Sequence, residues 1–164
     1  SLGQEGVSLA RVTLHVGLDT FRPVQSEEPE KHKLHSEYFE LGEEAAREIN
    51  LARAEGRRIV SVGTTSVRVL EQAALLSYHD SNSTLAPTAG WADLFILPGH
   101  RFRLVDGLIT NFHLPRSTLL MLVCAFAGRD PSADSGRRLV MRAYQEAIGQ
   151  EYRLFSFGDC MMVV

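Results

Sequence analysis

The clearest chemical signal in the sequence is Thr110-Asn111-Phe112-His113-Leu114-Pro115, a polar interruption between two apolar segments. The run from Thr118 to Ala127 carries no charge, so we expect a helix that is buried on all faces and begins near Ser117 as its N-cap. Such a helix would hold the preceding loop still. Because histidine titrates near neutral pH, His113 beside Asn111 indicates either proton transfer or a structural hydrogen bond, and both interpretations stay open.

A second polar junction, Gly63-Thr64-Thr65-Ser66, stands between an expected strand and an expected helix. A glycine permits a tight turn there. Hydroxyl groups beside the free N–H groups of a helix N-terminus suit a carboxylate, a phosphate or ribose hydroxyls. The simpler interpretation is that Thr65 or Ser66 is only an N-cap. The stretch lacks the Gly-x-x-x-x-Gly-Lys-Ser/Thr pattern, so it is not a P-loop.

The elements that position these junctions follow from the periodicity of apolar residues. Alternation in residues 10–17 places Val12, Leu14 and Val16 on one face of a strand and His15 on the other. We expect strands at 10–17, 36–41, 59–62, 94–97, 101–105, 107–110, 152–157 and 161–164, and helices at 42–56, 67–76, 117–128 and 136–148.

Strands and helices alternate in this order, with one β-meander in the middle and a hairpin expected for residues 101–110. The fold class is therefore α/β, with a mixed, mainly parallel sheet or a barrel-like domain. Sites in such folds gather where strands end and helices begin, which favours the two junctions.

Other polar groups give weaker signals. His32, His35 and Glu37 lie close together, but their spacing fits no standard zinc pattern and a charged loop is the simpler account, so no metal is expected. Asp159 is interpreted as a turn former between two strands.

The composition indicates an ordinary globular protein. The 164 residues suffice for one α/β domain spanning 1–164, and the net charge of −3 provides no general attraction for a polyanion. Cys124 and Cys160 form neither a disulfide framework nor a zinc framework, which favours reduced thiols in a cytoplasm. The apolar run is too short to cross a membrane. The chain starts without Met and enters an expected strand almost at once, which indicates a piece of a longer protein.

Five stretches together resemble the S-adenosylmethionine:tRNA ribosyltransferase-isomerase family of queuosine biosynthesis. They are VTLHVGLDTFRPV, HKLHSEYFEL, VGTTSVRVLE, LFILPGHRFRLVDGLITNFHLPRSTLLMLVCAFAG and YRLFSFGDCMMVV. The resemblance covers nearly the whole chain in the same order and corresponds to the carboxyl-terminal part of the family. It implies a barrel-like α/β domain, with the family's inserted β-barrel domain absent from this chain.

The resemblance also implies a reaction. Family members transfer the ribosyl group of S-adenosylmethionine to 7-aminomethyl-7-deazaguanine at the wobble position of tRNA, giving epoxyqueuosine, adenine and methionine. S-adenosylmethionine is consumed as a substrate, so no separate cofactor is expected, and tRNA is the expected partner. With a net charge of −3, binding of tRNA would depend on local patches such as Arg101, Arg103, Arg116, Arg137 and Arg138, or on the absent domain.

Roles for individual residues follow from motif position and side-chain chemistry. A sulfonium acidifies the neighbouring ribose C–H, so the chemistry calls for a base and for a proton donor to adenine. His113 is the first candidate for the acid or base and His15 the second. The candidate substrate-binding residues are Asn111, Thr64, Thr65, Ser66, Phe21, Phe112, Thr20 and Arg116.

The chain departs from the family pattern at Asp19, where the family usually has a second glycine, and at Leu154, Phe157 and Cys160. The Asp19 difference bears on ligand affinity, because a glycine there permits close backbone approach. The alternative function is a nucleotide- or partner-binding module without its own catalysis. A dinucleotide-binding enzyme ranks last, since no Gly-x-Gly-x-x-Gly follows a strand.

Overall fold

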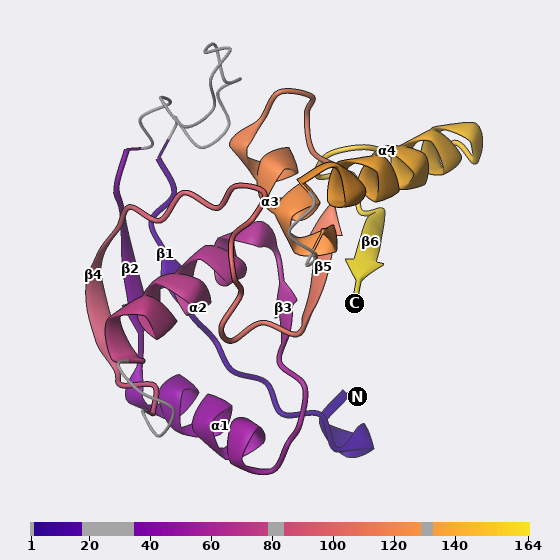
Figure 1. The fold of residues 1–164 in the computed structure, drawn as a ribbon. Helices are drawn as coiled ribbons and strands as arrows, with labels where there is room; N and C mark the ends of the chain where they lie inside the picture. The colour runs from indigo at the N-terminus through magenta and orange to yellow at the C-terminus, as the bar shows by residue number, and fades with distance from the viewer. Residues whose placement is uncertain (1, 18–34, 79–83, 129–132) are drawn as a thin grey trace.

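The computed structural model describes residues 2–17, 35–78, 84–128 and 133–164 (Figure 1). In chain order the elements are a 3-10 turn (Leu2–Glu5), β1 (Thr13–Leu14), β2 (Glu37–Leu41), α1 (Glu43–Ala54), β3 (Val60–Val62), α2 (Thr64–Ser77), β4 (Thr88–Ala92), β5 (Gly107–Asn111), α3 (Thr118–Ala127), α4 (Ala133–Gly149) and β6 (Cys160–Val163). None of the helices in the described ranges is long and apolar enough to cross a membrane.

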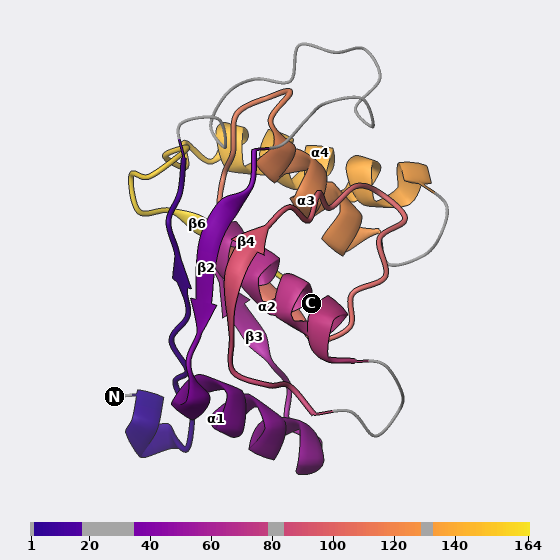
Figure 2. The same cartoon turned by 90° about the vertical axis from the view of Figure 1, so that its left-hand side faces the viewer.

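Two three-stranded sheets flank a central helix. The first sheet has the order β1-β2-β4 and is antiparallel, and the second has the order β3-β5-β6, with β3 parallel and β6 antiparallel to β5. Helix α2 lies between the sheets and contacts strands of both (Figures 1 and 2). The predicted α/β class is confirmed.

The share of parallel strand pairs is smaller than predicted. Only β3 and β5 are parallel among the described pairs, so the expectation of a mainly parallel sheet is wrong. A parallel pair needs a long crossover connection, and the chain supplies one between β3 and β5, which includes α2.

The core forms around α2, whose apolar side chains are buried from both sides. Val67, Val69 and Ala73 of this helix are fully buried, together with Phe39 from β2 and Leu108 from β5. Each buried side chain of the Val, Leu or Phe type contributes roughly 1.5–3 kcal/mol relative to exposure. Helix α2 therefore joins the two sheets into one core.

Most of the predicted helices and several strands are confirmed. Helix α1 ends just before Gly56, which has a positive φ of 68° as a helix stop requires, and α3 and α4 lie where they were expected. Helix α2 begins at Thr64, three residues earlier than expected. Strand β1 is shorter than predicted. Val12 and Leu14 pack against the core and His15 is exposed, as expected, but Val16, predicted on the inward face, is exposed.

The predicted strands at 94–97 and 101–105 are wrong, and so is the hairpin at 101–110. Side chains of α2 bind the main chain there. Gln72 accepts the Leu94 N–H at 3.1 Å, and the Glu71 carboxylate accepts the N–H groups of residues 103–105 at 2.8–3.1 Å. These apolar segments are thus held as irregular loops by side-chain acceptors.

The predicted strand at 152–157 is also wrong. Asp159 accepts hydrogen bonds from the main-chain N–H and the guanidinium of Arg153 at 2.6–3.1 Å, and Phe155 has a positive φ of 63°. The Arg153–Asp159 contact closes a turn before β6. The role of Asp159 as a turn former is confirmed, but it follows a loop and precedes one strand.

Helices α3 and α4 pack against each other closely at two glycines. No described residue of α3 is exposed, which confirms the prediction of a helix buried on all faces. A Cβ atom at Gly136 of α4 would lie 2.0 Å from the Cys124 carbonyl oxygen and 2.5 Å from the Gly128 nitrogen. The lack of a side chain at Gly136 therefore permits this approach.

Gly136→Ala is expected to lower the free energy of unfolding by about 1–3 kcal/mol or more, because the added methyl group must push the backbones apart. Gly149→Ala is the matched control, since a Cβ there meets no atom within 4 Å and alanine favours a helix by about 0.5–1 kcal/mol. Denaturant unfolding of both variants measures the difference. Equal stability of the two variants would contradict the predicted close packing.

Candidate functional site

A cleft of about 240 Å³ lies where β5 ends and α3 begins. Asn111 and His113 line it from the strand end, Ser117 and Leu119 from the helix, and Phe155 with Ser156 from the turn before β6; Phe112 and Leu114 complete the lining. The cleft thus contains both polar residues of the first junction.

His113 is held by hydrogen bonds on its ring and its main chain. The ring Nε2 lies 2.8 Å from Thr110 Oγ1, and the main-chain N–H donates to the Tyr144 hydroxyl at 2.6 Å. Burial lowers the pKa of His113 to about 4, so the imidazole is neutral at neutral pH. Thr110 occupies Nε2, and no hydrogen bond from a described residue reaches Nδ1. Nδ1 is therefore the ring nitrogen that a ligand can contact.

The loop between β5 and α3 is fixed at its helix end. Ser117 Oγ accepts the Leu120 N–H at 3.1 Å and donates to the Leu114 carbonyl at 2.8 Å, which confirms Ser117 as the N-cap. Arg116, a predicted substrate-binding residue, is exposed and has a positive φ of 56°. The Asn111–His113 loop therefore lies between a paired strand and a capped, buried helix.

Phe112 is placed differently from the other residues of this loop. Its side chain is only 3% exposed, and its ring packs edge-on against Tyr144 and Tyr152 with centroids 5.2 and 6.1 Å apart. The main-chain carbonyl of Phe112 accepts the Phe155 N–H at 2.9 Å. The ring thus supports the cleft from inside the core.

The second junction lies beside the first. The parallel pairing of β3 and β5 places Val62 opposite Ile109, and the Gly63 N–H donates to the Ile109 carbonyl at 2.8 Å. The polar residues at the ends of the two strands, 63–66 after β3 and 111–113 at the end of β5, therefore lie at the same edge of the sheet. This proximity is what a site at the ends of parallel strands requires.

The N-cap interpretation of Thr65 and Ser66 is wrong. Gly63 is the N-cap of α2, with a positive φ of 88° and no side-chain cap. Ser66 Oγ donates to the Val62 carbonyl at 2.8 Å, Thr64 is buried and Thr65 is exposed. Of these three residues only Thr65 is exposed, and ligand binding by them stays a prediction.

His15 lies apart from the cleft. It is exposed on the β1-β2-β4 sheet, where its ring centroid is 5.7 Å from that of Tyr38, and Tyr38 is 5.8 Å from Trp91. Trp91 is 67% exposed. The predicted site residues Thr20 and Phe21, with Asp19, lie outside the described residues. His15 is therefore not among the described residues that line the cleft with His113.

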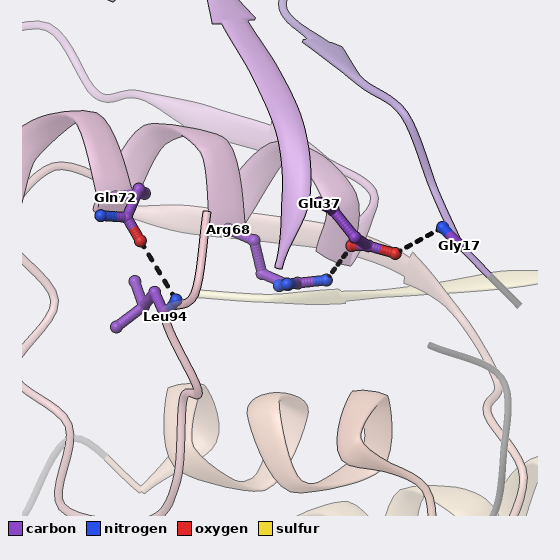
Figure 3. Close-up of polar contacts among 5 residues, drawn as sticks. All are labelled: Gly17, Glu37, Arg68, Gln72 and Leu94. Carbon is purple, nitrogen blue, oxygen red and sulfur yellow. Dashed lines mark hydrogen bonds and ion pairs between the residues drawn. The ribbon is translucent and has the colours of Figure 1, made fainter. Parts of the chain in front are cut away.

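Two buried charged residues were missed by the sequence analysis. Arg68 of α2 forms an ion pair through Nη1 with Oε2 of Glu37 of β2, and Glu37 Oε1 accepts the Gly17 N–H at 2.7 Å (Figure 3). Both side chains are about 4–5% exposed. The sequence contains a signal for both. Glu37 stands two residues before the inward-facing Phe39 and so lies on the same face of the strand, and Arg68 interrupts an apolar helix.

The weak histidine cluster does not form a metal site in the described part of the chain. No group of three His, Cys, Asp or Glu side chains there is arranged to hold an ion. Glu37 is engaged with Arg68, His35 is exposed, and His32 lies outside the described residues.

Comparison with known proteins gives consistent matches. A family model described as "Queuosine biosynthesis protein" matches residues 1–163. S-adenosylmethionine:tRNA ribosyltransferase-isomerase of Symbiobacterium thermophilum is 55% identical over 163 residues, which are 99% of this chain and 44% of the relative. The Heliobacterium modesticaldum protein of the same name is 54% identical over the same shares of both chains.

A solved structure matches as well. The crystal structure of S-adenosylmethionine tRNA ribosyltransferase from Thermotoga maritima aligns with a TM-score of 0.73 and 42% identity. The alignment covers 99% of this chain and 47% of that chain. The chain spans less than half the length of the curated relatives it matches.

The lowered pKa of His113 predicts a pH-dependent stability. The unfolded state, with a histidine pKa of about 6.5, binds the proton more readily than the folded state, with a pKa of about 4. The contribution of neutral His113 to stability is thus complete above pH 6.5 and is lost as the pH falls through about 4.

Denaturant unfolding at a series of pH values, with wild type and His113→Gln compared, tests this prediction. The wild type should lose more free energy of unfolding between neutral and acidic pH than the variant, whose side chain does not titrate. Identical pH profiles for the two proteins would show that His113 is not held neutral by burial.

Proposed function

The chain belongs to the queuosine biosynthesis protein family, and from that premise we propose that the full-length protein is an S-adenosylmethionine:tRNA ribosyltransferase-isomerase. It would transfer the ribosyl group of S-adenosylmethionine to 7-aminomethyl-7-deazaguanine at the wobble position of tRNA, and form epoxyqueuosine with release of adenine and methionine. S-adenosylmethionine would be consumed as a substrate, with no separate cofactor. A tRNA substrate implies a cytoplasmic enzyme.

The observation that carries the proposal is the edge at which β3 and β5 both end. It places the hydroxyl-bearing turn at residues 63–66 beside Asn111 and His113. Hydroxyl, amide and imidazole groups are suitable partners for the ribose hydroxyls of S-adenosylmethionine. A reaction that rearranges a sugar also requires that several fixed groups hold the ribosyl group in one orientation.

The protonation state of His113 favours the role of base over that of acid. A neutral imidazole has a free lone pair that can accept a proton from the acidified ribose C–H beside the sulfonium. An imidazolium is scarce in a site where the pKa is about 4, so protonation of the departing adenine is better assigned to another group. Nδ1 is the nitrogen proposed to act, in the tautomer in which the Nε2–H group donates to Thr110 Oγ1.

The remaining candidates keep different roles in the proposal. His15, on the exposed sheet face beside Tyr38, is placed to meet a substrate that approaches that face. Phe112 would act by supporting the cleft wall, since its ring is buried. Thr65 has an exposed side chain for a substrate hydroxyl or phosphate.

Contact with tRNA is proposed through exposed arginines. The five arginines of the predicted patches are all exposed, although the chain as a whole has a net charge of −3. Binding through phosphate contacts weakens steeply as salt rises. The five are Arg101, Arg103, Arg116, Arg137 and Arg138.

The full-length protein is expected to convert tRNA that carries 7-aminomethyl-7-deazaguanine to epoxyqueuosine-containing tRNA when S-adenosylmethionine is supplied. His113→Ala should lower kcat by about 10²–10⁴-fold if His113 is the base. Mass spectrometry of nucleosides from digested tRNA measures both results. Arg47→Ala on the exposed surface of α1 is the control and should keep normal turnover.

Two outcomes would reject parts of the proposal. Absence of a new modified nucleoside with the wild type would reject the activity. Near-normal turnover of both His113→Ala and His15→Ala would reject the assignment of the base. Calorimetry with S-adenosylmethionine on this chain and on the full-length protein tests the alternative, because binding without turnover in both would support a binding module.

A further inference from the structure

Arg68 carries hydrogen-bond donors that the described structure leaves unused. Its Nη1 pairs with Glu37, but Nε and Nη2 are buried and have no hydrogen-bond partner. These two nitrogens lie on the same edge of the planar guanidinium, the edge that binds a carboxylate through two parallel hydrogen bonds. Because a buried donor without an acceptor costs free energy, this edge indicates a partner that the described residues do not supply.

Arg68 lines a small cavity at the N-terminus of α3. Arg68 lines this cavity together with Thr118 and Leu119, the first two residues of the ten-residue helix, and with apolar side chains. Ser117 caps only the Leu120 N–H, so among the described residues the Thr118 and Leu119 N–H groups remain as donors. The positive end of the α3 dipole adds to the attraction for an anion.

The cavity adjoins the cleft that contains His113. Leu119 lines both the cavity and the cleft. The cavity has a volume of about 10 Å³, enough for one oxygen-sized group. A carboxylate is larger, so its binding requires the side chains that line the cavity to move apart.

We propose that Arg68 and the N-terminus of α3 bind the carboxylate of the methionine part of S-adenosylmethionine. The inference rests on the proposed function and adds the group that fixes the far end of the ligand, with the ribose toward Asn111 and His113. Glu37 holds the guanidinium from the opposite side and keeps it oriented (Figure 3). The guanidinium and two N–H groups supply the hydrogen bonds that a desolvated carboxylate needs.

The test compares S-adenosylmethionine with decarboxylated S-adenosylmethionine, which keeps the sulfonium, ribose, adenine and amine. Calorimetry on the full-length protein measures both dissociation constants. Wild type should prefer the carboxylate-bearing ligand by about 10- to 100-fold, the range for hydrogen bonds to a charged group. The paired variant Glu37→Gln with Arg68→Gln, which avoids an unpaired buried charge, should bind both ligands with nearly equal affinity.

Arg47→Ala is the control, since the Arg47 side chain is 70% exposed on α1. The preference of this variant for S-adenosylmethionine should equal that of the wild type. A preference that survives in the paired variant would overturn the inference, and so would equal binding of the two ligands by the wild type. Thermal unfolding verifies that each variant is folded.

Failure of the inference can be told apart from failure of the proposed function. A wild type that modifies tRNA and binds both ligands equally would overturn only the carboxylate site, and Arg68 would then have a structural role. A wild type that binds neither ligand and modifies no tRNA would overturn both.

Discussion

The constraint on which the rest of the structure depends is the burial of Arg68, Glu71 and Gln72 on α2. A helix enclosed by two sheets must find partners for every polar group that it carries inward, because an unpaired buried group costs more than its hydrogen bond contributes. Glu71 is completely buried and binds the main chain of residues 103–105, and Gln72 binds Leu94. Arg68 pairs with Glu37 and so ties β2 and Gly17 to the same helix. The loops around α2 are therefore ordered by its side chains.

This constraint explains which elements the sequence predicts correctly. Helices α1, α3 and α4 follow from apolar periodicity because each buries a continuous stripe or surface that local sequence describes. The segments 94–97 and 101–105 have the apolar pattern of strands, and Ile96, Leu104 and Val105 within them are buried. The local sequence does not show which group accepts the hydrogen bonds of their main-chain N–H groups. In this fold the acceptor is a side chain about 20–35 positions away. Periodicity reports burial but not the identity of the hydrogen-bond partner.

The residues of the candidate site also differ in whether local sequence reveals them. Both polar junctions were found from local sequence, and their proximity follows from the parallel pairing of β3 and β5. Glu37 and Arg68 were missed because charged residues are normally interpreted as surface residues. Each looks ordinary alone, and only the packing of β2 on α2 shows that the two neutralise each other. Long-range pairs of this kind are visible in a sequence only as charges at inward positions.

The cleft that contains His113 and the cavity lined by Arg68 have electrostatic properties that suit opposite ends of one ligand. His113 is neutral because it is desolvated, so it adds no positive charge to a cleft proposed to receive a sulfonium. An imidazolium there would repel that cation and would lack the lone pair that a base requires. Beyond Leu119 the situation is reversed, since Arg68 and the N-terminus of α3 both favour negative charge. A zwitterion such as S-adenosylmethionine, with its cationic sulfur and its carboxylate separated by a short carbon chain, would then be oriented by charge before any proton moves.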